Sequence, residues 1–494
     1  MTPEELKQNV DTIVVVMMEN RSFDHVLGYL TSPTFGNRQD VDGIADPKDL
    51  RYLNPNSDGQ GIAPFWMDDG PFTSDLPHDP DAVKTQLAYS DIKKTYLMNG
   101  FVQAFENEFH TSVSQPPVMG LLRPASLPTT AALAAKYSVC DRWFACIPTS
   151  TAPNRLMSMC GYTDLRDTGA IVPDQATVYD WLLDRGVSWR VYHAGLPFFM
   201  LMPKLAPLIL TSHFRPLDDL AEDLAKGDPN DWPQVIFIEP DYYDSPIHIR
   251  GACDNHAPLA MAPGEQFLAE VYRTLSSDHQ RWARTVLIVT YDEHGGCFDH
   301  VAPLPVKYRN PNGVAFDTTG PRVPAIVVGP FAPPGVCHDS LDNTSILQLL
   351  AERFGKTGET YSPEVSGRMA QKIGSVSAVL SVSANNGTSC TLPGGRFQTV
   401  EDGGPAPMAT NNLYQAFERA AKDLASRHKV EAFAKFPQLR GYVESQAPIA
   451  PISGRAEVKP PSQAAAQSPL GTVSSKKPTP KPRRDLRRKS TRRS

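Results

Sequence analysis

Residues 285–301 read TVLIVTYDEHGGCFDHV, and this stretch decides the fold that we expect. The β-branched and apolar run from Thr285 to Thr290 is typical of a strand buried on both faces of a parallel sheet. Two adjacent carboxylates, Asp292 and Glu293, follow the run, and then two glycines. Because adjacent acids at a strand end are costly unless they bind a cation or pair with bases, the stretch predicts a functional turn.

Other short apolar runs in the chain resemble this strand. We predict strands over Thr12–Met17, Trp189–Tyr192, Val235–Ile238 and Ala325–Val328, and helices over Ala82–Tyr89, Ala131–Tyr137, Thr177–Asp184, Gly264–Leu275 and Asn343–Phe354. Alternation of strands and helices predicts an α/β fold, with a parallel-type central sheet flanked by helices on both faces. Polar residues end three strands, at Glu19–Asn20, Glu239–Asp241 and Asp292–Glu293. We expect them to meet in one crevice beyond the carboxyl ends of the strands.

The length and composition suggest one large catalytic domain with additions. The chain has 494 residues, of which 41% are hydrophobic and 21% charged, which is ordinary for a globular enzyme. We expect a catalytic domain over residues 1–374 that includes an ordered insertion near 38–80. A linker and C-terminal helical region should follow over 375–446, with a helix near 411–427. Residues 447–494 are rich in Pro, Ser, Lys and Arg, which predicts a disordered basic tail.

The charge is unevenly distributed along the chain. From residue 455 onward there are 12 Lys and Arg and two acids, so the tail carries +10; the total of −6 leaves about −16 for the rest (−6 − 10). An acidic body does not resemble a nucleic-acid-binding surface. Any contact with an anionic membrane or with nucleic acid would therefore fall to the tail, and a merely solvated tail is the alternative.

The cysteines and the N-terminus give an expectation about location. The seven cysteines are scattered and include no CxxC pair, which argues against a disulfide framework or a structural zinc site. The first twenty residues open with polar and acidic positions, and their apolar run is short, unlike a secretory signal. We expect a cytoplasmic protein, with export by a non-standard route as the alternative.

Two clusters of oxygen ligands suggest a metal site. Glu19 and Asn20 end the first strand, and Asp292 and Glu293 end the strand quoted above. Carboxylate and amide oxygens suit a hard divalent ion, so Ca, Mg or Mn is expected rather than Zn. A helix-capping turn is the alternative for Glu19–Asn20 when it is considered alone.

Hydroxyl groups precede a predicted helix start in the segment IPTSTAPNRLMSMCG, residues 147–161. Ser150 and Thr151 lie just before Pro153, and proline is favoured in the first turn of a helix. A hydroxyl there would lie at the positive end of the helix, where backbone N–H groups hold phosphate. A nearby metal would lower its pKa and make it a nucleophile, and Arg155 could bind two phosphoryl oxygens. A simple N-cap is the alternative.

Three histidines lie close to acids in predicted loops. They are His78 in DLPHDPD, His256 in DNHAP beside Asp254, and His300 next to Asp299. A leaving alkoxide needs a proton, and histidine titrates near neutrality. Arg322, in GPRVP, is either a phosphate contact or a structural ion pair, and the structural role is favoured.

Together the segments ENRSFDH, PTSTAPNR, DNHAP, TYDEHGGCFDHV and GPRVPAIVVGPF resemble the bacterial phosphoesterase family of phospholipases C and certain acid phosphatases. That family is similar in fold to the alkaline phosphatase superfamily, and the resemblance spans roughly residues 11–355. It implies one metal ion on Glu19, Asn20, Asp292 and Glu293. It also implies Thr151 as the nucleophile with Ser150 second, His78 and His256 at the phosphate or the leaving group, and Asp254 paired with His256. The expected substrate contacts are Ser150, Asn154, Arg155, Asp299 and His300.

The chain departs from the family pattern at two peripheral positions. Asn99 replaces a common Asp, and Asn343 replaces a common His. The paired β-domains that follow the catalytic part of longer phospholipases C are not apparent. The resemblance therefore implies a metal-dependent phosphate-ester hydrolase working through a phospho-enzyme, either like an acid phosphatase or like a short phospholipase C.

Two other functions stay open. One is a phosphodiesterase that cleaves phosphatidylcholine or sphingomyelin, for which Trp143, Trp189, Tyr192, Tyr242 and Tyr243 could supply aromatic faces for choline. The other is a non-catalytic protein that binds phosphate or a membrane.

Overall fold

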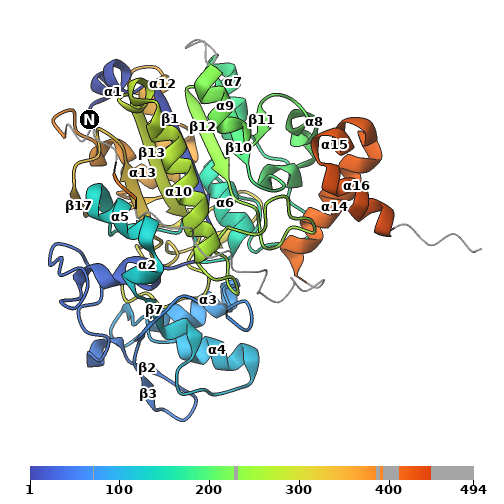
Figure 1. The fold of residues 1–494 in the computed structure, drawn as a ribbon. Helices are drawn as coiled ribbons and strands as arrows, with labels where there is room; N and C mark the ends of the chain where they lie inside the picture. Colours follow the sequence, from blue (N-terminus) through green and yellow to red (C-terminus); the bar gives the residue numbers. More distant parts are fainter. Residues whose placement is uncertain (71, 227–231, 385–389, 393–410, 447–494) are drawn as a thin grey trace, which may run out of the picture. The chain divides into compact units, whose positions relative to one another are not determined.

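An eight-stranded sheet lies at the centre of the computed structural model (Figure 1), with the strand order β11-β10-β12-β1-β13-β16-β8-β17. The strands are β1 (Thr12–Met18), β8 (Ser138–Cys140), β10 (Trp189–His193), β11 (Phe214–Pro216), β12 (Val235–Glu239), β13 (Thr285–Tyr291), β16 (Ala325–Val328) and β17 (Gly335–Cys337). The five strands from β11 to β13 pair in parallel, and β17 is parallel to β8. The predicted α/β fold with a mostly parallel sheet is confirmed.

The direction of β16 differs from the prediction. This strand is antiparallel to both β13 and β8. A parallel connection needs a crossover, usually a helix. The chain between β13 and β16 forms only two short strands, β14 (Tyr308–Arg309) and β15 (Ala315–Phe316), and returns in the opposite direction. The prediction of a parallel strand over Ala325–Val328 was therefore wrong.

The central strands are buried along their whole length. Every residue of β1 and β13 is buried, which explains why both sequences are continuously apolar. One group of contacting helices contains α1 (Pro3–Asn9), α6 (Thr151–Cys160), α12 (Thr344–Phe354) and α13 (Pro363–Ala370). A second group contains α5 (Pro128–Lys136), α9 (Asp219–Lys226), α10 (Ala262–Ser277) and α11 (His279–Trp282). In Figure 1, α10 crosses in front of the sheet.

A second, smaller core lies at the end of the sheet where β1 and β13 finish (blue to cyan in Figure 1). It is built mainly from residues 44–121, including the predicted insertion. The elements here are β2 (Asn54–Pro55), β3 (Gly61–Ile62), β4 (Phe65–Met67), α3 (Pro80–Leu87), β5 (Tyr89–Ser90), β6 (Thr95–Tyr96), α4 (Phe101–Phe109) and β7 (Gly120–Leu122). The helix α2 (Phe23–Leu27) contacts β7, but its apolar residues belong to the main core. The smaller core covers the carboxyl ends of the central strands.

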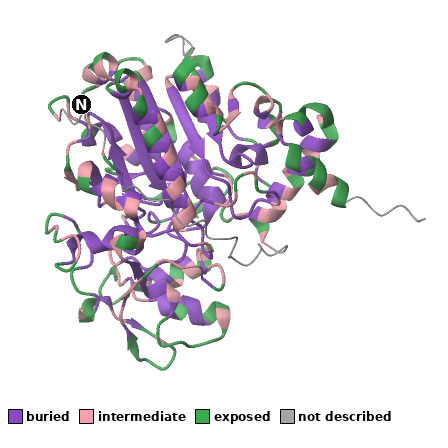
Figure 2. Cartoon of the chain, in the orientation of Figure 1, coloured by how far each residue is buried: buried purple, intermediate pink, exposed green. Residues whose placement is uncertain are grey.

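Three helices follow the predicted linker: α14 (Asn412–Arg427), α15 (Lys429–Lys435) and α16 (Pro437–Gln446). The helix predicted near 411–427 is confirmed, and Asn411 caps it by accepting bonds from the backbone of Leu413 and Tyr414. α14 packs against the short 3-10 helix Phe198–Leu201. Figure 2 shows that these C-terminal helices contain both buried residues, in purple, and exposed residues, in green.

The structure describes residues 1–70, 72–226, 232–384, 390–392 and 411–446. Residues 1–446 form one compact unit. The basic tail, 447–494, and most of the predicted linker lie outside the described residues. Across the described part of the chain, the helices are too short or too polar to cross a membrane. The remaining described elements are α7 (Val178–Asp184), α8 (Ala206–Ile209), β9 (Trp143–Phe144) and β18 (Leu341–Asp342).

Candidate active site

The ends of β1 and β13 bring two of the predicted clusters together. The two strands run in parallel with Met18 opposite Tyr291, so the residues that follow them are neighbours. The backbone N–H of Asn20 donates to Asp292 Oδ1 at 3.2 Å, and Glu19, Asn20, Asp292 and Glu293 are all fully buried. The four predicted metal ligands therefore lie next to one another, buried at the ends of β1 and β13.

The glycines after Glu293 permit a close approach of the two loops. Asn20 and Gly295 both have positive φ angles, 60° and 57°. A Cβ added to Gly295 would lie 2.1 Å from the Asn20 carbonyl oxygen, which no side chain can tolerate. The glycine thus lets the turn after β13 pack directly on the turn after β1.

The start of α6 positions Thr151. Ser150 is the N-cap and Thr151 is the first residue of the helix. The Thr151 hydroxyl donates to Asn20 Oδ1 at 3.3 Å. The Ser150 hydroxyl instead donates to Asp167 Oδ1 at 2.6 Å and contacts the Thr168 hydroxyl at 2.8 Å. Of the two candidate nucleophiles, Thr151 is the one that contacts a predicted metal ligand.

The side chain of Asn154 closes the turn before α6. It donates to the carbonyl oxygens of Ile147, Thr149 and Ser150 and accepts from the N–H of Ile147. These four bonds occupy the amide, so it shapes the loop that carries Thr151. The structure therefore places this predicted substrate contact in the backbone scaffold.

The guanidinium of Arg155 lies between the two acid clusters. Its Nε donates to Glu19 Oε1 at 3.0 Å and to Asp292 Oδ2 at 3.2 Å, and one terminal nitrogen donates to the Tyr242 hydroxyl at 2.9 Å. The other nitrogen reaches the carbonyl oxygens that end β1. Arg155 therefore balances the buried carboxylates, a role that the sequence did not predict.

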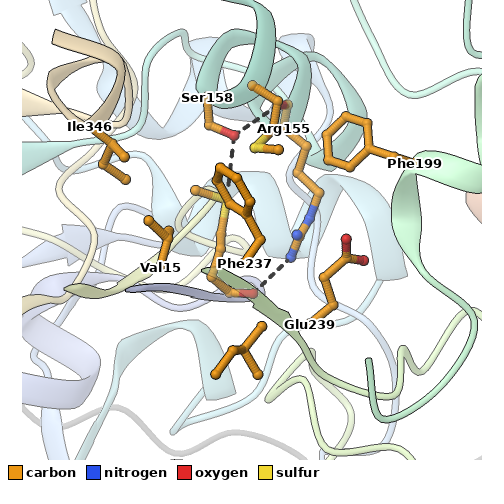
Figure 3. A pocket seen from close by; sticks show the side chains of 10 residues that line it. Val15, Arg155, Ser158, Phe199, Phe237, Glu239 and Ile346 are labelled. Carbon is orange, nitrogen blue, oxygen red and sulfur yellow. Dashed lines mark hydrogen bonds between the residues drawn. The ribbon is translucent and has the colours of Figure 1, made fainter. Parts of the chain in front are cut away.

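Arg155 also lines a small cavity of about 30 Å³, and Figure 3 shows its side chain among the residues around it. Val15 and Phe237 from the sheet, Ser158 from α6 and Ile346 from α12 line it. Glu239, which ends β12, points toward Arg155 and accepts from the Tyr242 hydroxyl at 3.1 Å. The third acidic strand end therefore belongs to the same buried network.

The imidazole of His256 lies at the centre of several acids. Its Nε2 is 2.8 Å from Asn20 Nδ2 and 3.1 Å from Asp75 Oδ1, and its Nδ1 is 3.4 Å from both Glu19 Oε2 and Asp244 Oδ2. Burial alone would lower the pKa of His256, but the charge of Asp75 and hydrogen bonds to the acids raise it well above 6.5. The ring is therefore suited to hold a proton.

His78 lies beside His256. The two rings are 5.7 Å apart, and His78 Nε2 is 3.5 Å from Asn20 Nδ2 and 4.0 Å from Glu293 Oε1. Burial would lower the pKa of His78, yet the charges of Asp75 and Glu293 raise it to about 9. The structure thus brings both predicted histidines to the predicted metal ligands.

The carboxylate of Asp254 does not face the His256 ring. It accepts from the backbone N–H groups of His256, at 3.1 Å, and Tyr243, at 2.7 Å. Burial, together with the charge of Glu19, raises the pKa of Asp254 to about 7. Asp254 therefore shapes the loop, whereas Asp75 and Asp244 are the acids at the ring. Sequence reasoning singled out neither: Asp75 lies in the DLPHDPD segment, where only His78 was named, and Asp244 lies in a loop with no motif spacing.

Asp299 and His300 belong to a different buried network. Asp299 accepts from Arg322 Nε at 2.9 Å, and the His300 ring contacts Asp24 Oδ2 at 2.6 Å. Arg322 also donates to Asp24 at 2.9 Å and is fully buried. Arg322 therefore forms structural ion pairs, which is the role that the sequence analysis favoured over phosphate binding. The structure places the two predicted substrate contacts beside Arg322, with no described bond to Thr151.

Unpartnered carboxylate oxygens suggest that a cation fits this site. Within the described residues, Glu19 Oε2, Glu293 Oε1 and both oxygens of Asp244 are buried and accept no well-aligned hydrogen bond. The histidine contacts to them are longer, 3.4 Å from His256 and 4.0 Å from His78. Glu19, Asp244 and His256 can each bring one ligand atom within 4.8 Å of the others. Because leaving such groups unpaired is costly, and oxygen ligands suit a hard divalent ion, the donor set fits a metal. Asp292 differs, since both of its oxygens already accept bonds.

A cavity of about 400 Å³ opens onto these residues. Thr151, His78, His256 and Asp244 line it together with residues from loops 74–79 and 167–168, from α4 and from the start of α14. Five carboxylates and no Lys or Arg line it among the described residues: Asp75, Asp79, Glu108, Asp167 and Asp244. The predicted nucleophile, two histidines with raised pKa and a candidate cation site thus line one pocket.

The sequence matches the model of the Phosphoesterase family over residues 10–356. Since this is more than half of the chain, the protein belongs to the phosphoesterase family, as the motif resemblance predicted.

Curated relatives carry phospholipase names. Non-specific phospholipase C1 of Arabidopsis thaliana is 36% identical over 358 residues, which are 68% of this chain and 64% of the relative. The non-hemolytic phospholipase C of Burkholderia pseudomallei is 26% identical over 78% of this chain and 61% of its own length. The chain therefore spans slightly less than two thirds of these relatives.

Among solved structures, a protein in the alkaline phosphatase superfamily from Vibrio parahaemolyticus aligns with 14% identity and a TM-score of 0.27, covering 49% of this chain and 66% of its own. The lipoteichoic acid synthase LtaP from Listeria monocytogenes aligns with 13% identity and a TM-score of 0.30, covering 62% and 86%. Similarity at this level adds no argument to the one made by the sheet itself.

Proposed function

We propose that this protein hydrolyses phosphate esters with Thr151 as the nucleophile. The observation that carries the proposal is the position of Thr151 at the first residue of α6, bonded to Asn20 and lining the same cavity as His78 and His256. The names of the phospholipase relatives support the ester class.

The chain's own residues divide the work as follows. The backbone N–H of Thr151, the first residue of α6, binds a phosphoryl oxygen, because it has no partner within the helix. The next N–H, that of Ala152, already donates to the Thr168 hydroxyl, and Pro153 has none.

The Thr151 hydroxyl, oriented by its hydrogen bond to Asn20 Oδ1, attacks phosphorus in line. Its proton passes to a carboxylate that lines the cavity, such as Asp75 or Asp244, and from there to solvent. A proton from His78 or His256 goes to the departing alcohol. Water then hydrolyses the phosphothreonine.

A divalent ion held by Glu19, Glu293 and Asn20, with Asp292 or Asp244 completing the set, would lower the pKa of the nucleophile and stabilise charge on phosphorus. Arg155 keeps Glu19 and Asp292 in place while the site is loaded. Ca, Mg and Mn are the candidates, because the ligands are mainly oxygen atoms.

The lining of the cavity favours a choline diester as the second candidate substrate. Five carboxylates without an opposing Lys or Arg would attract a cationic alcohol or head group and repel an additional anion. Phe109 adds one aromatic side chain to the lining. A phosphodiesterase that acts on a phosphocholine ester is therefore the second candidate function, after a phosphomonoesterase.

The test is hydrolysis of p-nitrophenyl phosphate and p-nitrophenyl phosphorylcholine, each with and without chelator. Turnover of the monoester alone would favour an acid-phosphatase-like enzyme, and preference for the choline ester a phospholipase C. Loss of activity in chelator would support the metal site. No turnover of either ester would overturn the proposal and favour a non-catalytic phosphate-binding protein.

A further inference from the structure

The first turn of α14 forms part of the active-site cavity. Asn411, Asn412 and Leu413 line the same 400 Å³ space as Thr151 and His256. These residues lie well beyond the segment that matches the family, which ends at residue 356. The wall that α14 supplies therefore comes from residues outside the segment that matches the family model.

Asn412 also contacts the loop that holds the nucleophile. Its side-chain nitrogen donates to the Thr168 carbonyl oxygen at 3.0 Å. The hydroxyl of Thr168 accepts from the N–H of Ala152 at 3.0 Å, and its backbone N–H donates to the Ser150 hydroxyl at 2.9 Å. One loop thus connects the start of α14 to the start of α6.

The next turns of α14 anchor it on the other side of the site. The ring of Phe417, which is fully buried, lies 5.6 Å from that of Tyr242 and 6.3 Å from that of Phe198. Tyr242 in turn accepts a bond from Arg155. Leu413 is also buried in the main core. With anchors at both ends, the first turn of α14 is a fixed part of the cavity.

We propose that the first turn of α14 determines which esters the active site accepts, with Asn412 limiting the size of the group attached to phosphorus. The inference rests on the proposed function. When phosphorus is within reach of Thr151, the rest of the ester must fit into the remaining cavity, and Asn412 borders that space. A larger side chain at this position fills volume that only a large ester needs.

The experiment compares Asn412→Trp with the wild type in the full chain. Asn412 is exposed at the cavity mouth, so the substitution adds bulk without opening the core. The control is Arg419→Trp, an exposed position two turns along the same helix that does not line the cavity. kcat and KM are measured on p-nitrophenyl phosphate and naphthol AS-BI phosphate, and on p-nitrophenyl phosphorylcholine and dihexanoylphosphatidylcholine.

Within whichever ester class the wild type hydrolyses, Asn412→Trp should raise KM about tenfold for the larger ester and less than about twofold for the smaller. Arg419→Trp should leave both values unchanged. Asn412→Ala, which enlarges the cavity, should shift the ratio toward the larger ester, and it keeps the test valid if the Trp variant fails to fold.

Equal losses on the small and large esters would show that Asn412 only supports the fold, and would overturn the inference. An unchanged ratio in both variants would do the same while leaving the proposed function intact. If the wild type turned over none of the four esters, the proposed function would fail first and the inference with it.

Discussion

Replacing Arg322 by Met should lower the free energy of unfolding more than removing an exposed ion pair would. Arg322 is fully buried and donates to Asp24 and Asp299, each at 2.9 Å, and to the carbonyl oxygens of Asp42 and Asp141. Methionine fills similar volume but leaves Asp299 without its cation, while Asp24 keeps only the His300 ring. Removing one partner of a buried ion pair costs about 3–5 kcal/mol.

The expected shift in Tm follows from the size of the folded unit, 446 residues. At about 2.1 cal/mol/K per residue, the unfolding entropy is about 0.9 kcal/mol/K, so the loss corresponds to about 3–5 °C. Thermal unfolding followed by circular dichroism would measure it at pH 7.5.

The matched control is Arg427→Met, since Arg427 forms an exposed helical pair with Asp423. Such a pair contributes about 0.3–0.5 kcal/mol, so the control should shift Tm by less than about 1 °C. At pH 5 the Arg322→Met deficit should shrink, because burial already raises the pKa of Asp299 to about 6 and this carboxyl then protonates. A variant that melts within 1 °C of the wild type at pH 7.5 would refute the reasoning.

Three further predictions concern the ionisable groups. Burial alone would lower the pKa of His300, but Asp24 raises it to about 9. Its stabilising effect is therefore full below about pH 6.5 and lost as pH rises through 9, so the Tm advantage over His300→Gln should vanish by pH 10. Burial raises the pKa of the Asp244 carboxyl, because desolvation outweighs the 3.4 Å contact with His256. Asp244→Asn should therefore raise Tm in chelator while lowering kcat by about tenfold or more, as steady-state assays would show. A saturating divalent ion at about 100 times its Kd should stabilise the wild type by about 2.7 kcal/mol in thermal-shift measurements. The same ion should stabilise Glu19→Gln much less, and equal shifts would contradict the metal site.

The main strands and several helices could be predicted because their patterns are strong. The runs at Thr12 and Thr285 are continuously apolar, and β1 and β13 are buried on both faces. β8, β11 and β17 were missed because three-residue strands have no periodic pattern. The direction of β16 depends on how the preceding loop returns, which local sequence does not specify.

The candidate site was predictable where a motif joins a strand or helix end to a chemical group. Glu19, Asn20, Asp292 and Thr151 belong to such motifs, and the fold brings them together. Asp75 and Asp244 were not singled out as site residues, because a loop acid has many structural roles. Tyr242 was considered only as an aromatic face for choline, whereas its hydroxyl contacts Arg155. The helix α14 was predicted, but its contribution to the cavity was not, because only the folded chain brings Asn412 beside Thr168.

The charge-balancing role of Arg155 shows a further limit of sequence reasoning. A buried arginine near a candidate nucleophile suggests phosphate binding. Its actual partners depend on which side chains the fold places within hydrogen-bond distance of the guanidinium. Here Glu19, Asp292 and Tyr242 occupy the guanidinium. Only the spatial arrangement of strand ends decides between these roles.

The most direct test of the central claim is turnover by Thr151→Ala, measured beside Ser150→Ala and Thr151→Ser with the better of the two p-nitrophenyl esters. The account predicts a loss of about a thousandfold or more in kcat for Thr151→Ala. Substantial activity should remain in the other two variants, and acid-quenched wild type should carry phosphate on Thr151. Turnover by Thr151→Ala near the wild-type rate would contradict the claim that this threonine is the nucleophile.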